Sequence, residues 1–409
     1  MPNPQRAPTN PIFPGYFADP FVWEHAGAYY AVGTGELEAG GEAGGAGGIF
    51  PLLRSDDFVT WRPAGRALEP PDPALGDTYW APEVTYAEGR FYLYYSVGFA
   101  DRQHQLRVAA ADAPLGPYRD LDAPLTDRTR CAFAIDPHLF QDDDGQRYLF
   151  YATDFLDCEA PLRAGTALVV DRLESMTRLA GEARVVLRAR HDWQRFLAER
   201  PMYGGVYDWH TLEGPCVRKR SGRYYCLYSG GRWETESYGV DFGVADHVLG
   251  PYADACPEGP RVLRSVPGTI IGPGHTSIVR GPDGATDYIA YHAWGPDRRA
   301  RRPHLDPLVW GPDGPRCLGP TVGPREPAGA AEARGLDQLF LFGPGIGPGA
   351  AGPPAEAGGS GRPLVPRGVG SIRTAKPAPS PGAGLPRAPA SGRARDAARG
   401  ARALPPAGL

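Results

Sequence analysis

The sequence predicts an all-β protein built as a five-bladed β-propeller, and three observations carry that prediction. Alternating apolar and polar residues recur throughout residues 1–320, whereas the period of amphipathic helices is scarce. Five segments share one plan: a strand that starts at an acidic or polar residue, a turn, and an aromatic-rich strand. Their spacings of 64, 53, 77 and 62 residues leave room for four short strands in each repeat, which is the content of a propeller blade.

Each segment is expected to form the two inner strands of one blade. In four of them Asp-Gly or Gly-Arg lies between two alternating runs, as tight hairpin turns do. One position per segment is taken as equivalent, namely Asp19, Glu83, Asp136, Glu213 and His275. In chain order the segments are ADPFVWEHAGAYYAVGT from Ala18, APEVTYAEGRFYLYYSVG from Ala81, IDPHLFQDDDGQRYLFYATD from Ile135, LEGPCVRKRSGRYYCLYSGG from Leu212 and GHTSIVRGPDGATDYIAYHAW from Gly274.

The propeller is expected to span residues 11–321 and to be followed by a segment of different composition. Residues 322–409 are rich in Gly, Pro, Ala and Arg and keep only two aromatic residues, Phe340 and Phe342. Such a segment buries too little apolar surface to offset the entropy lost on ordering. The tail is therefore expected to be a disordered linker, a basic surface-binding arm or the product of a frameshift, the last because the codons of these four residues are rich in G and C.

The charge distribution argues against two classes of partner. Net charge is −4 overall, and residues 322–409 carry 11 basic against 5 acidic side chains, which leaves −10 for the rest of the chain. An acidic body argues against nucleic acid as the main partner. No apolar run reaches the roughly 20 residues that span a bilayer. The N-terminus lacks a basic segment followed by an apolar stretch, so cytoplasmic placement is expected.

Three carboxylates at the equivalent positions indicate chemistry in the central channel. Asp19 and Asp136 each precede proline, and Glu213 precedes Gly-Pro. Any one of them is explained as a turn residue, but three in register converge on one channel. Carboxylates that meet in an aromatic-lined cavity repel one another, which raises the pKa of at least one. The set fits glycoside hydrolysis, in which one carboxyl protonates the leaving oxygen and another activates water or attacks directly.

An ordered set of motifs resembles family 43 of the glycoside hydrolases from about Pro11 to Thr321. The resemblance implies a five-bladed propeller and inverting hydrolysis of α-L-arabinofuranosides, β-D-xylosides or arabinans. By motif, Asp19 would be the general base, Glu213 the general acid, and Asp136 the residue that raises the pKa of the acid and positions substrate. Inversion requires the carboxyls of Asp19 and Glu213 to lie about 6.5–9.5 Å apart. The motifs are ADP at 18–20, WAPEV at 80–84, AIDPHLF at 134–140, EGPCV at 213–217, GPGH at 272–275 and YHAW at 291–294.

The resemblance also implies two further site residues, His275 and Arg301, and a cation, and an aromatic residue beside an inner strand is expected to bind the sugar. His275 is expected in the channel, either near a calcium ion held through water or as a hydrogen-bonded histidine. Trp80 is favoured over Trp209 as a platform for a sugar ring, although both aromatics could serve the core. Arg301 matches an arginine that reaches the active site, within a local sequence, RRPHLDP, that departs from the family pattern. No organic cofactor is expected.

The leading hypothesis is an exo-acting, inverting α-L-arabinofuranosidase or β-D-xylosidase that acts on small oligosaccharides. Two alternatives stay open, namely a retaining propeller hydrolase that cleaves fructans or sucrose, and a non-catalytic carbohydrate-binding propeller. The longest insertion between repeats, HDWQRFLAERPMYGGVYDWH at 191–210, is expected to form a short helix and a loop that acts as a lid. The choice between arabinose and xylose and the oligomeric state stay open.

Overall fold

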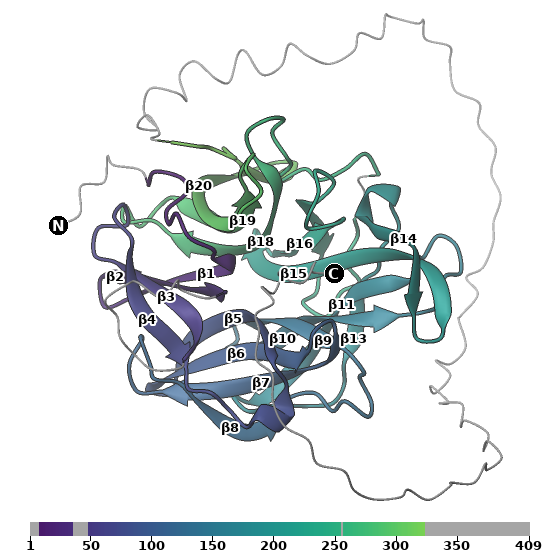
Figure 1. Cartoon of the computed structure of the whole chain (residues 1–409), viewed down its shortest axis with the longest axis horizontal. Helices are drawn as coiled ribbons and strands as arrows, with labels where there is room; N and C mark the ends of the chain where they lie inside the picture. Colours follow the sequence, from purple (N-terminus) through teal and green to yellow (C-terminus); the bar gives the residue numbers. More distant parts are fainter. Residues whose placement is uncertain (1–7, 36–47, 255–256, 324–409) are drawn as a thin grey trace, which may run out of the picture. The chain divides into compact units, whose positions relative to one another are not determined.

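The computed structural model describes residues 8–35, 48–254 and 257–323, and these residues form an all-β unit (Figure 1). They contain no α-helix and only two 3-10 turns, η1 (Pro73–Leu75) and η2 (Asp192–Gln194), so no helix in the described part of the chain is long and apolar enough to cross a membrane. The predicted tail lies outside the described residues from 324 onward.

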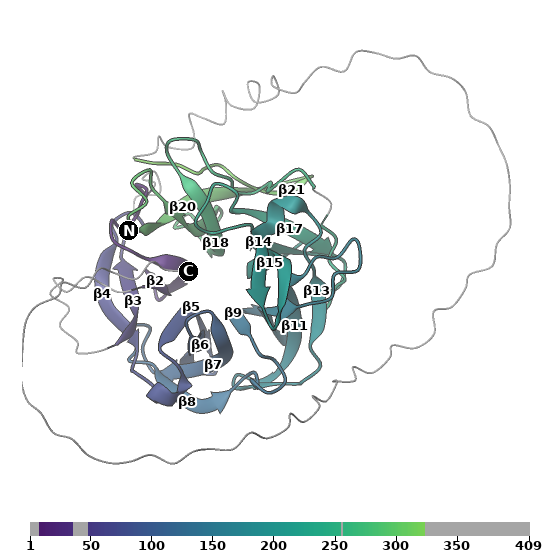
Figure 2. The same ribbon diagram turned by 45° about the vertical axis from the view of Figure 1, so that its right-hand side comes forward.

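Twenty-one described strands are distributed over five blades, as predicted. In Figure 2, β5, β9, β15 and β18 lie around the middle of the unit, while β8, β13 and β21 lie at its periphery. The first blade is β1 (Ala18–His25), β2 (Ala28–Thr34), β3 (Ile49–Ser55) and β4 (Arg62–Leu68). The second is β5 (Thr78–Ala87), β6 (Arg90–Phe99), β7 (Arg102–Ala111) and β8 (Arg119–Pro124). The third is β9 (Ala134–Gln141), β10 (Arg147–Phe155) and β11 (Gly165–Ser175), with β12 (Arg178–Leu179) and β13 (Arg184–Leu187) on β11.

The fourth and fifth blades complete the ring. The fourth is β14 (Arg195–Met202), β15 (Gly205–Arg220), β16 (Arg223–Gly230) and β17 (Gly239–Ala245), and the fifth is β18 (Ile271–Arg280), β19 (Asp287–Trp294), β20 (Arg301–Gly311) and β21 (Gly314–Cys317). A short parallel pairing between β11 and β15 joins the third and fourth blades into one sheet. Five buried apolar clusters each draw their residues from two neighbouring blades, so the core consists of the seams between blades.

Every inner strand carries a β-bulge at the same place. Two consecutive residues of the inner strand face one residue of the second strand, and the first of the two has a positive φ of 48° to 59°. A bulge interrupts the hydrogen-bond ladder, so the proline at its second position in four blades costs no ladder bond, and the bulge turns the adjacent side chains. The bulges are Asp19-Pro20, Ala81-Pro82, Asp136-Pro137, Gly214-Pro215 and His275-Thr276.

The bulges correct the predicted equivalence. Asp19, Asp136 and His275 are equivalent, and Asp and His tolerate a positive φ better than most residues. Glu213 instead lies one residue before its bulge, and Glu83 directly follows its own. The predicted equivalence placed the acidic residues of the repeats at one common position. The feature that the blades share is instead the bulge, whose second residue is proline in four of the five blades.

The insertion at residues 191–210 forms a hairpin, which corrects the predicted short helix and loop. Only η2 is helical, and β14 then pairs with the start of β15 through the two-residue turn Tyr203-Gly204. Both turn residues have a positive φ, 50° and 78°, which suits the twist of a two-residue hairpin.

The segment before β1 closes the ring. The amides of Ile12 and Phe17 donate to the carbonyls of Pro303 and Arg301, both at 2.9 Å. Asn10 is buried; its side chain accepts from the amide of Leu305 at 2.8 Å and donates to a carboxylate oxygen of Asp306 at 3.1 Å and to the hydroxyl of Thr321 at 3.0 Å. The two ends of the described propeller are thereby joined.

Asn10→Ala is expected to lower the free energy of unfolding by about 1–3 kcal/mol, because buried partners lose their hydrogen bonds. Urea denaturation measures the effect. An exposed site on the same unit, Asp56→Ala, serves as the control and should change stability little. A loss no larger than that of the control would contradict the closing role of Asn10.

Candidate active site

The bulges bring the predicted acidic residues together in the channel. His275 Nδ1 lies 3.5 Å from Asp19 Oδ1 and 3.8 Å from Asp136 Oδ2. The amide of Gly214, next to Glu213, donates to Asp136 Oδ2 at 2.9 Å. Asp19, Asp136 and His275 are buried and Glu213 is partly buried, so three blades, the first, third and fourth, supply carboxylates to one enclosed site that the fifth blade completes.

Asp19 is surrounded by cationic and hydrogen-bonding groups. Arg301 Nη1 lies 3.5 Å from Asp19 Oδ1, and the amide of Asp19 donates to Nδ1 of His292 at 3.1 Å. Burial acts to raise the pKa of Asp19, but His275 and Arg301 outweigh it, so the pKa lies well below the usual range of an aspartate. Asp19 is therefore an ionised carboxylate at neutral pH.

Glu213 and Asp136 behave in the opposite way. Burial raises the pKa of Glu213 to about 7, helped by the charge of Asp19 and opposed by a hydrogen bond from Tyr238 Oη to Glu213 Oε1 at 2.6 Å. Burial, followed by the charges of Glu213 and Asp19, raises the pKa of Asp136 as well. The site thus pairs an ionised carboxylate with an acid whose pKa lies near neutral pH and with a second carboxyl group whose pKa is also raised.

Arg301 is placed in the site as the sequence predicts. Its guanidinium donates twice to Tyr16 Oη, at 2.9 and 2.6 Å, and lies 4.5 Å from the ring centroid of Trp233. The unusual local sequence does not disturb it, because the next side chain, Arg302, pairs with Asp297 at 2.9 Å instead. The phenol, the indole and Asp19 hold the guanidinium in one place.

The two tryptophans weighed as sugar platforms have different surroundings. Trp209 is 1% exposed and belongs to the core, which agrees with the preference for Trp80. Trp80 is half-buried and stacks on His104 with ring centroids 3.9 Å apart. It precedes the bulge of the second blade as Glu213 precedes that of the fourth, so it adjoins the channel. Its role as a platform stays a prediction.

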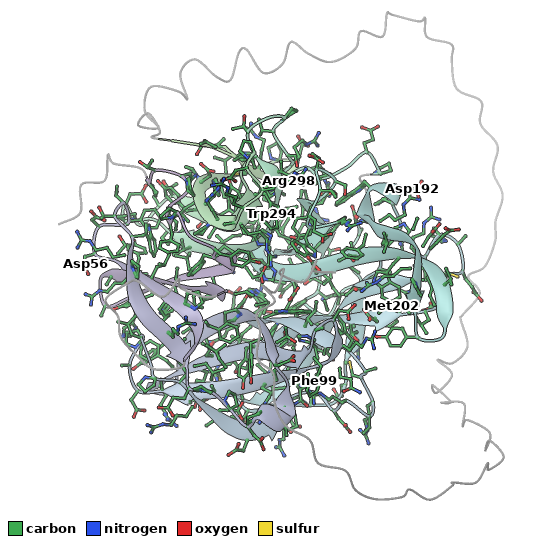
Figure 3. The ribbon with its side chains drawn as sticks, viewed as in Figure 1. Asp56, Phe99, Asp192, Met202, Trp294 and Arg298 are labelled. Carbon is green, nitrogen blue, oxygen red and sulfur yellow. The ribbon has the colours of Figure 1, made fainter. Side chains whose placement is uncertain are left out.

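Sequence reasoning missed several residues of the site. Tyr16, Trp233, Tyr238 and His292 all lie outside the five equivalent positions. His292 stands in the YHAW motif, which was the one available signal, and its ring stacks on Tyr238 with centroids 5.9 Å apart. Figure 3 labels Trp294, whose ring stacks on Trp233 with centroids also 5.9 Å apart. These aromatic groups converge only through the fold, so no local pattern marks them.

Glu83, the fourth carboxylate of the repeats, forms a buried pair. His138 Nδ1 lies 3.0 and 3.1 Å from the two carboxylate oxygens of Glu83, and His138 Nε2 accepts from the amide of Val217 at 2.9 Å. Because Nε2 is an acceptor, the ring carries its proton on Nδ1 and donates it to Glu83. This pair links the second, third and fourth blades beside the channel.

The donors around His275 do not fit directly bound calcium. Calcium takes several oxygen ligands, whereas His275 presents a ring nitrogen toward two carboxylates. In the part of the chain that the structure describes, no group of three His, Cys, Asp or Glu side chains is arranged to hold a metal ion. A cation held through water stays a prediction.

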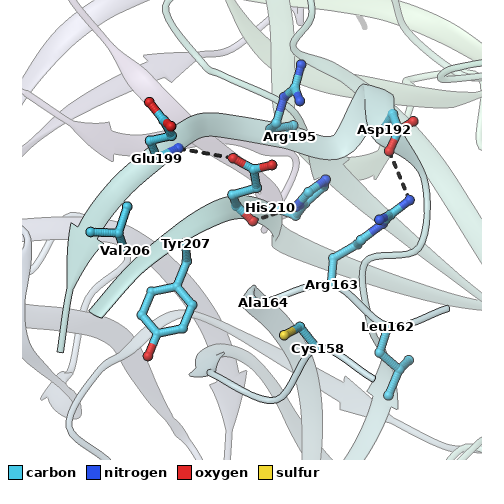
Figure 4. A pocket seen from close by; sticks show the side chains of 11 residues that line it. Cys158, Leu162, Arg163, Ala164, Asp192, Arg195, Glu199, Val206, Tyr207 and His210 are labelled. Atoms are coloured by element: carbon cyan, nitrogen blue, oxygen red, sulfur yellow. Dashed lines mark hydrogen bonds and ion pairs between the residues drawn. The ribbon is translucent and has the colours of Figure 1, made fainter. Parts of the chain in front are cut away.

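A separate cavity of about 540 Å³ lies beside the β14–β15 hairpin, and none of the predicted site residues lines it (Figure 4). The loop between β10 and β11 forms one wall with Arg163, and the hairpin forms the other with Arg195, Glu199, Tyr207 and His210. Asp192 pairs with Arg163 at 3.0 Å across its edge. The cavity and the carboxylate site are therefore distinct features.

Comparisons with known proteins identify the family of this chain. The family model described as glycosyl hydrolases family 43 matches residues 8–315. The β-D-galactofuranosidase xynD of Aspergillus niger is 29% identical over 298 residues, which cover 69% of this chain and 75% of that protein. The extracellular endo-α-(1→5)-L-arabinanase 1 of Bacillus subtilis is 25% identical over 284 residues, or 64% of this chain and 77% of that one.

Solved structures show the same relationship. A thermostable family-43 glycoside hydrolase superposes with a TM-score of 0.66 at 28% identity, covering 78% of this chain and 99% of that one. An endo-1,4-β-xylanase from Bacteroides thetaiotaomicron gives a TM-score of 0.60 at 28% identity, covering 76% and 97%. With the match over residues 8–315 and the propeller in common, this chain belongs to family 43 of the glycosyl hydrolases and is a glycoside hydrolase.

Proposed function

We propose that the protein is an inverting glycosidase that removes terminal α-L-arabinofuranosyl or β-D-xylosyl residues from oligosaccharides. Asp19 acts as the base, Glu213 as the acid, and Asp136 keeps the acid protonated. One observation carries the proposal: within one buried site the pKa of Asp19 is lowered while the pKa of Glu213 is raised to about 7. Two carboxyl groups with pKa values driven apart are what acid and base catalysis requires.

The two groups act in a single displacement. Asp19 takes a proton from a water molecule as the water oxygen bonds to the anomeric carbon. Glu213 gives its proton to the glycosidic oxygen as the bond from that oxygen to the anomeric carbon breaks. Asp19 is then protonated and Glu213 ionised, and exchange with solvent restores both. Arg301 supports this cycle because its charge favours the ionised form of Asp19.

The β14–β15 hairpin supports cleavage at chain ends. The bulges lie near the start of each inner strand. The start of an inner strand pairs with the end of the second strand, as Ala18 does with Thr34 and Trp80 with Ser96, so the second strands end on the same face of the propeller. On that face Arg200 of β14 pairs with Asp101 of the second blade at 2.9 Å. The hairpin tip, Tyr203, donates to Asp154 of the third blade at 2.7 Å. The hairpin thus crosses the third blade and forms a strap beside the mouth of the channel.

Arg200→Ala is expected to raise the rate on internal bonds of arabinan or xylan relative to the rate on an aryl pentoside, because the strap loses its anchor to the second blade. Product lengths measured by chromatography give the ratio. The control, Arg147→Ala, removes an ion pair with Glu88 at 2.9 Å on the opposite face and should leave the ratio unchanged. An unchanged ratio in Arg200→Ala would remove the strap as support for terminal cleavage.

A substrate panel tests the function as a whole. Aryl α-L-arabinofuranoside, aryl β-D-xyloside and aryl β-D-galactofuranoside are compared, the last because the Aspergillus relative is named for that sugar. Turnover of either pentoside supports the proposal, whereas turnover of the galactofuranoside alone would replace the substrate. A parallel series with a chelator tests the predicted cation, since unchanged rates would contradict a functional role for it.

A further inference from the structure

Tyr238 lies against the carboxyl group of Glu213, and the mechanism proposed above gives it no role. The residue directly precedes β17, is 1% exposed, and donates from Oη to Glu213 Oε1 at 2.6 Å. Burial and the charge of Glu213 raise the pKa of Tyr238 well above its usual value, so the phenol keeps its proton at every working pH. Glu213 Oε1 therefore always faces a hydrogen-bond donor.

We propose that Tyr238 is a positioning residue that confines the acidic proton of Glu213 to Oε2, the oxygen left for the glycosidic oxygen. The inference rests on the proposed role of Glu213 as the acid. An oxygen that accepts a short hydrogen bond from a phenol is a poor place for a proton, so the protonated carboxyl carries it on the other oxygen. A proton held on one oxygen needs no rotation of the carboxyl before transfer.

The fifth blade makes room for this tyrosine. A Cβ atom at Gly274 would lie 2.1 Å from Tyr238 Cε1, which is far inside van der Waals contact. Gly274 precedes its bulge as Glu213 precedes the bulge of the fourth blade. The fifth blade thus places no side chain at the position where the fourth blade carries the acid, and the ring of Tyr238 occupies that space.

Burial and three neighbouring groups set the titration of Glu213. Burial and the charge of Asp19 oppose its ionisation, while the hydroxyl of Tyr238 and the charge of Arg301 favour it. The charge of Glu213 in turn raises the pKa of Asp136. Removing the hydroxyl alone should therefore raise the pKa of Glu213. The acid would stay protonated to a higher pH, so the basic limb of the pH profile should shift to higher pH. Proton transfer from Glu213 to the glycosidic oxygen should become slower.

The test compares Tyr238→Phe with Tyr94→Phe, a buried tyrosine of the second blade that donates to the carbonyl of Met176 at 2.7 Å. In Tyr238→Phe we expect the apparent pKa of the basic limb of the kcat/KM profile to rise by about one unit. We also expect kcat to fall about tenfold on a glycoside with a poor leaving group. The loss should shrink for a dinitrophenyl glycoside, which needs little protonation. Gly274→Ala, whose Cβ would displace the ring of Tyr238, should change both quantities in the same direction, and Tyr94→Phe should change neither.

The outcomes separate this inference from the proposed function. A lower kcat in Tyr238→Phe with an unmoved basic limb, or with the same loss on both leaving groups, would show a merely structural role and overturn the inference. If Tyr238→Phe does not fold, Gly274→Ala decides by the same two readouts. If Glu213→Gln is fully active, the proposed function fails. If Glu213→Gln is inactive while the basic limb of Tyr238→Phe has the same pKa as that of the unchanged protein, only the inference fails.

Discussion

Asp19→Asn is expected to lower kcat/KM by about 10²–10⁴-fold, the usual contribution of a positioned base. The amide cannot take a proton from water, and it leaves the charge of Arg301 at 3.5 Å without its carboxylate. Asparagine is the right replacement because it tolerates the φ of 49° at this bulge, whereas alanine would add backbone strain. Steady-state kinetics on the aryl glycoside that the substrate panel identifies measures the loss.

The matched control for this change is Asp56→Asn. Asp56 pairs with Arg54 on the surface of the same blade and is 72% exposed at its side chain (Figure 3). This variant should keep the activity of the unchanged protein. Near-normal activity in Asp19→Asn would show that the base is another group, and the role proposed for Asp19 would have to be abandoned.

Glu213→Gln is expected to lower kcat/KM by a similar factor of about 10²–10⁴ on glycosides with poor leaving groups, and by much less on dinitrophenyl glycosides. The leaving oxygen of the latter departs without a proton, so only the former depend on the acid. A series of aryl glycosides with graded leaving-group pKa measures the dependence. An equal loss across the series would mean that Glu213 does not protonate the leaving group.

The pH profile of the unchanged protein follows from the same group. With its pKa raised to about 7, Glu213 loses its proton as the pH rises through that value, so kcat/KM should fall there. Because folding raises the pKa of Glu213 from 4.5 to about 7, this glutamate destabilises the folded state increasingly from about pH 4.5, and the cost is complete above pH 7. Glu213→Gln should therefore not lower the melting temperature at pH 8, which separates lost catalysis from lost folding.

Much of this fold could be predicted because its repeat is local. Each blade begins with a strand, a tight turn and an aromatic-rich strand within about twenty residues, so five such segments could be found one at a time. The register of the site could not be predicted in the same way. The bulge shifts Glu213 and Glu83 off the common position. Its proline recurs visibly in four repeats, but the positive φ before that proline shows only in the backbone.

The surroundings of the carboxylates depend on contacts between distant residues. Arg301 meets Tyr16 across 285 positions of the chain, and Tyr238 meets Glu213 across 25. Neither tyrosine stands in a repeated motif, so composition and spacing could not point to them. The insertion at 191–210 was predicted as a lid, but its hairpin was missed, because the two strands pair through a Tyr-Gly turn whose positive φ values the sequence does not display.

The stereochemistry of the first product tests the central claim most directly. Proton NMR of an α-L-arabinofuranoside or β-D-xyloside digest, recorded before the sugar mutarotates, shows which anomer is released. A base at Asp19 that activates water and an acid at Glu213 predict the β anomer of arabinose or the α anomer of xylose. Release of the anomer with the configuration of the substrate would contradict the account, because it requires a covalent intermediate in place of an activated water.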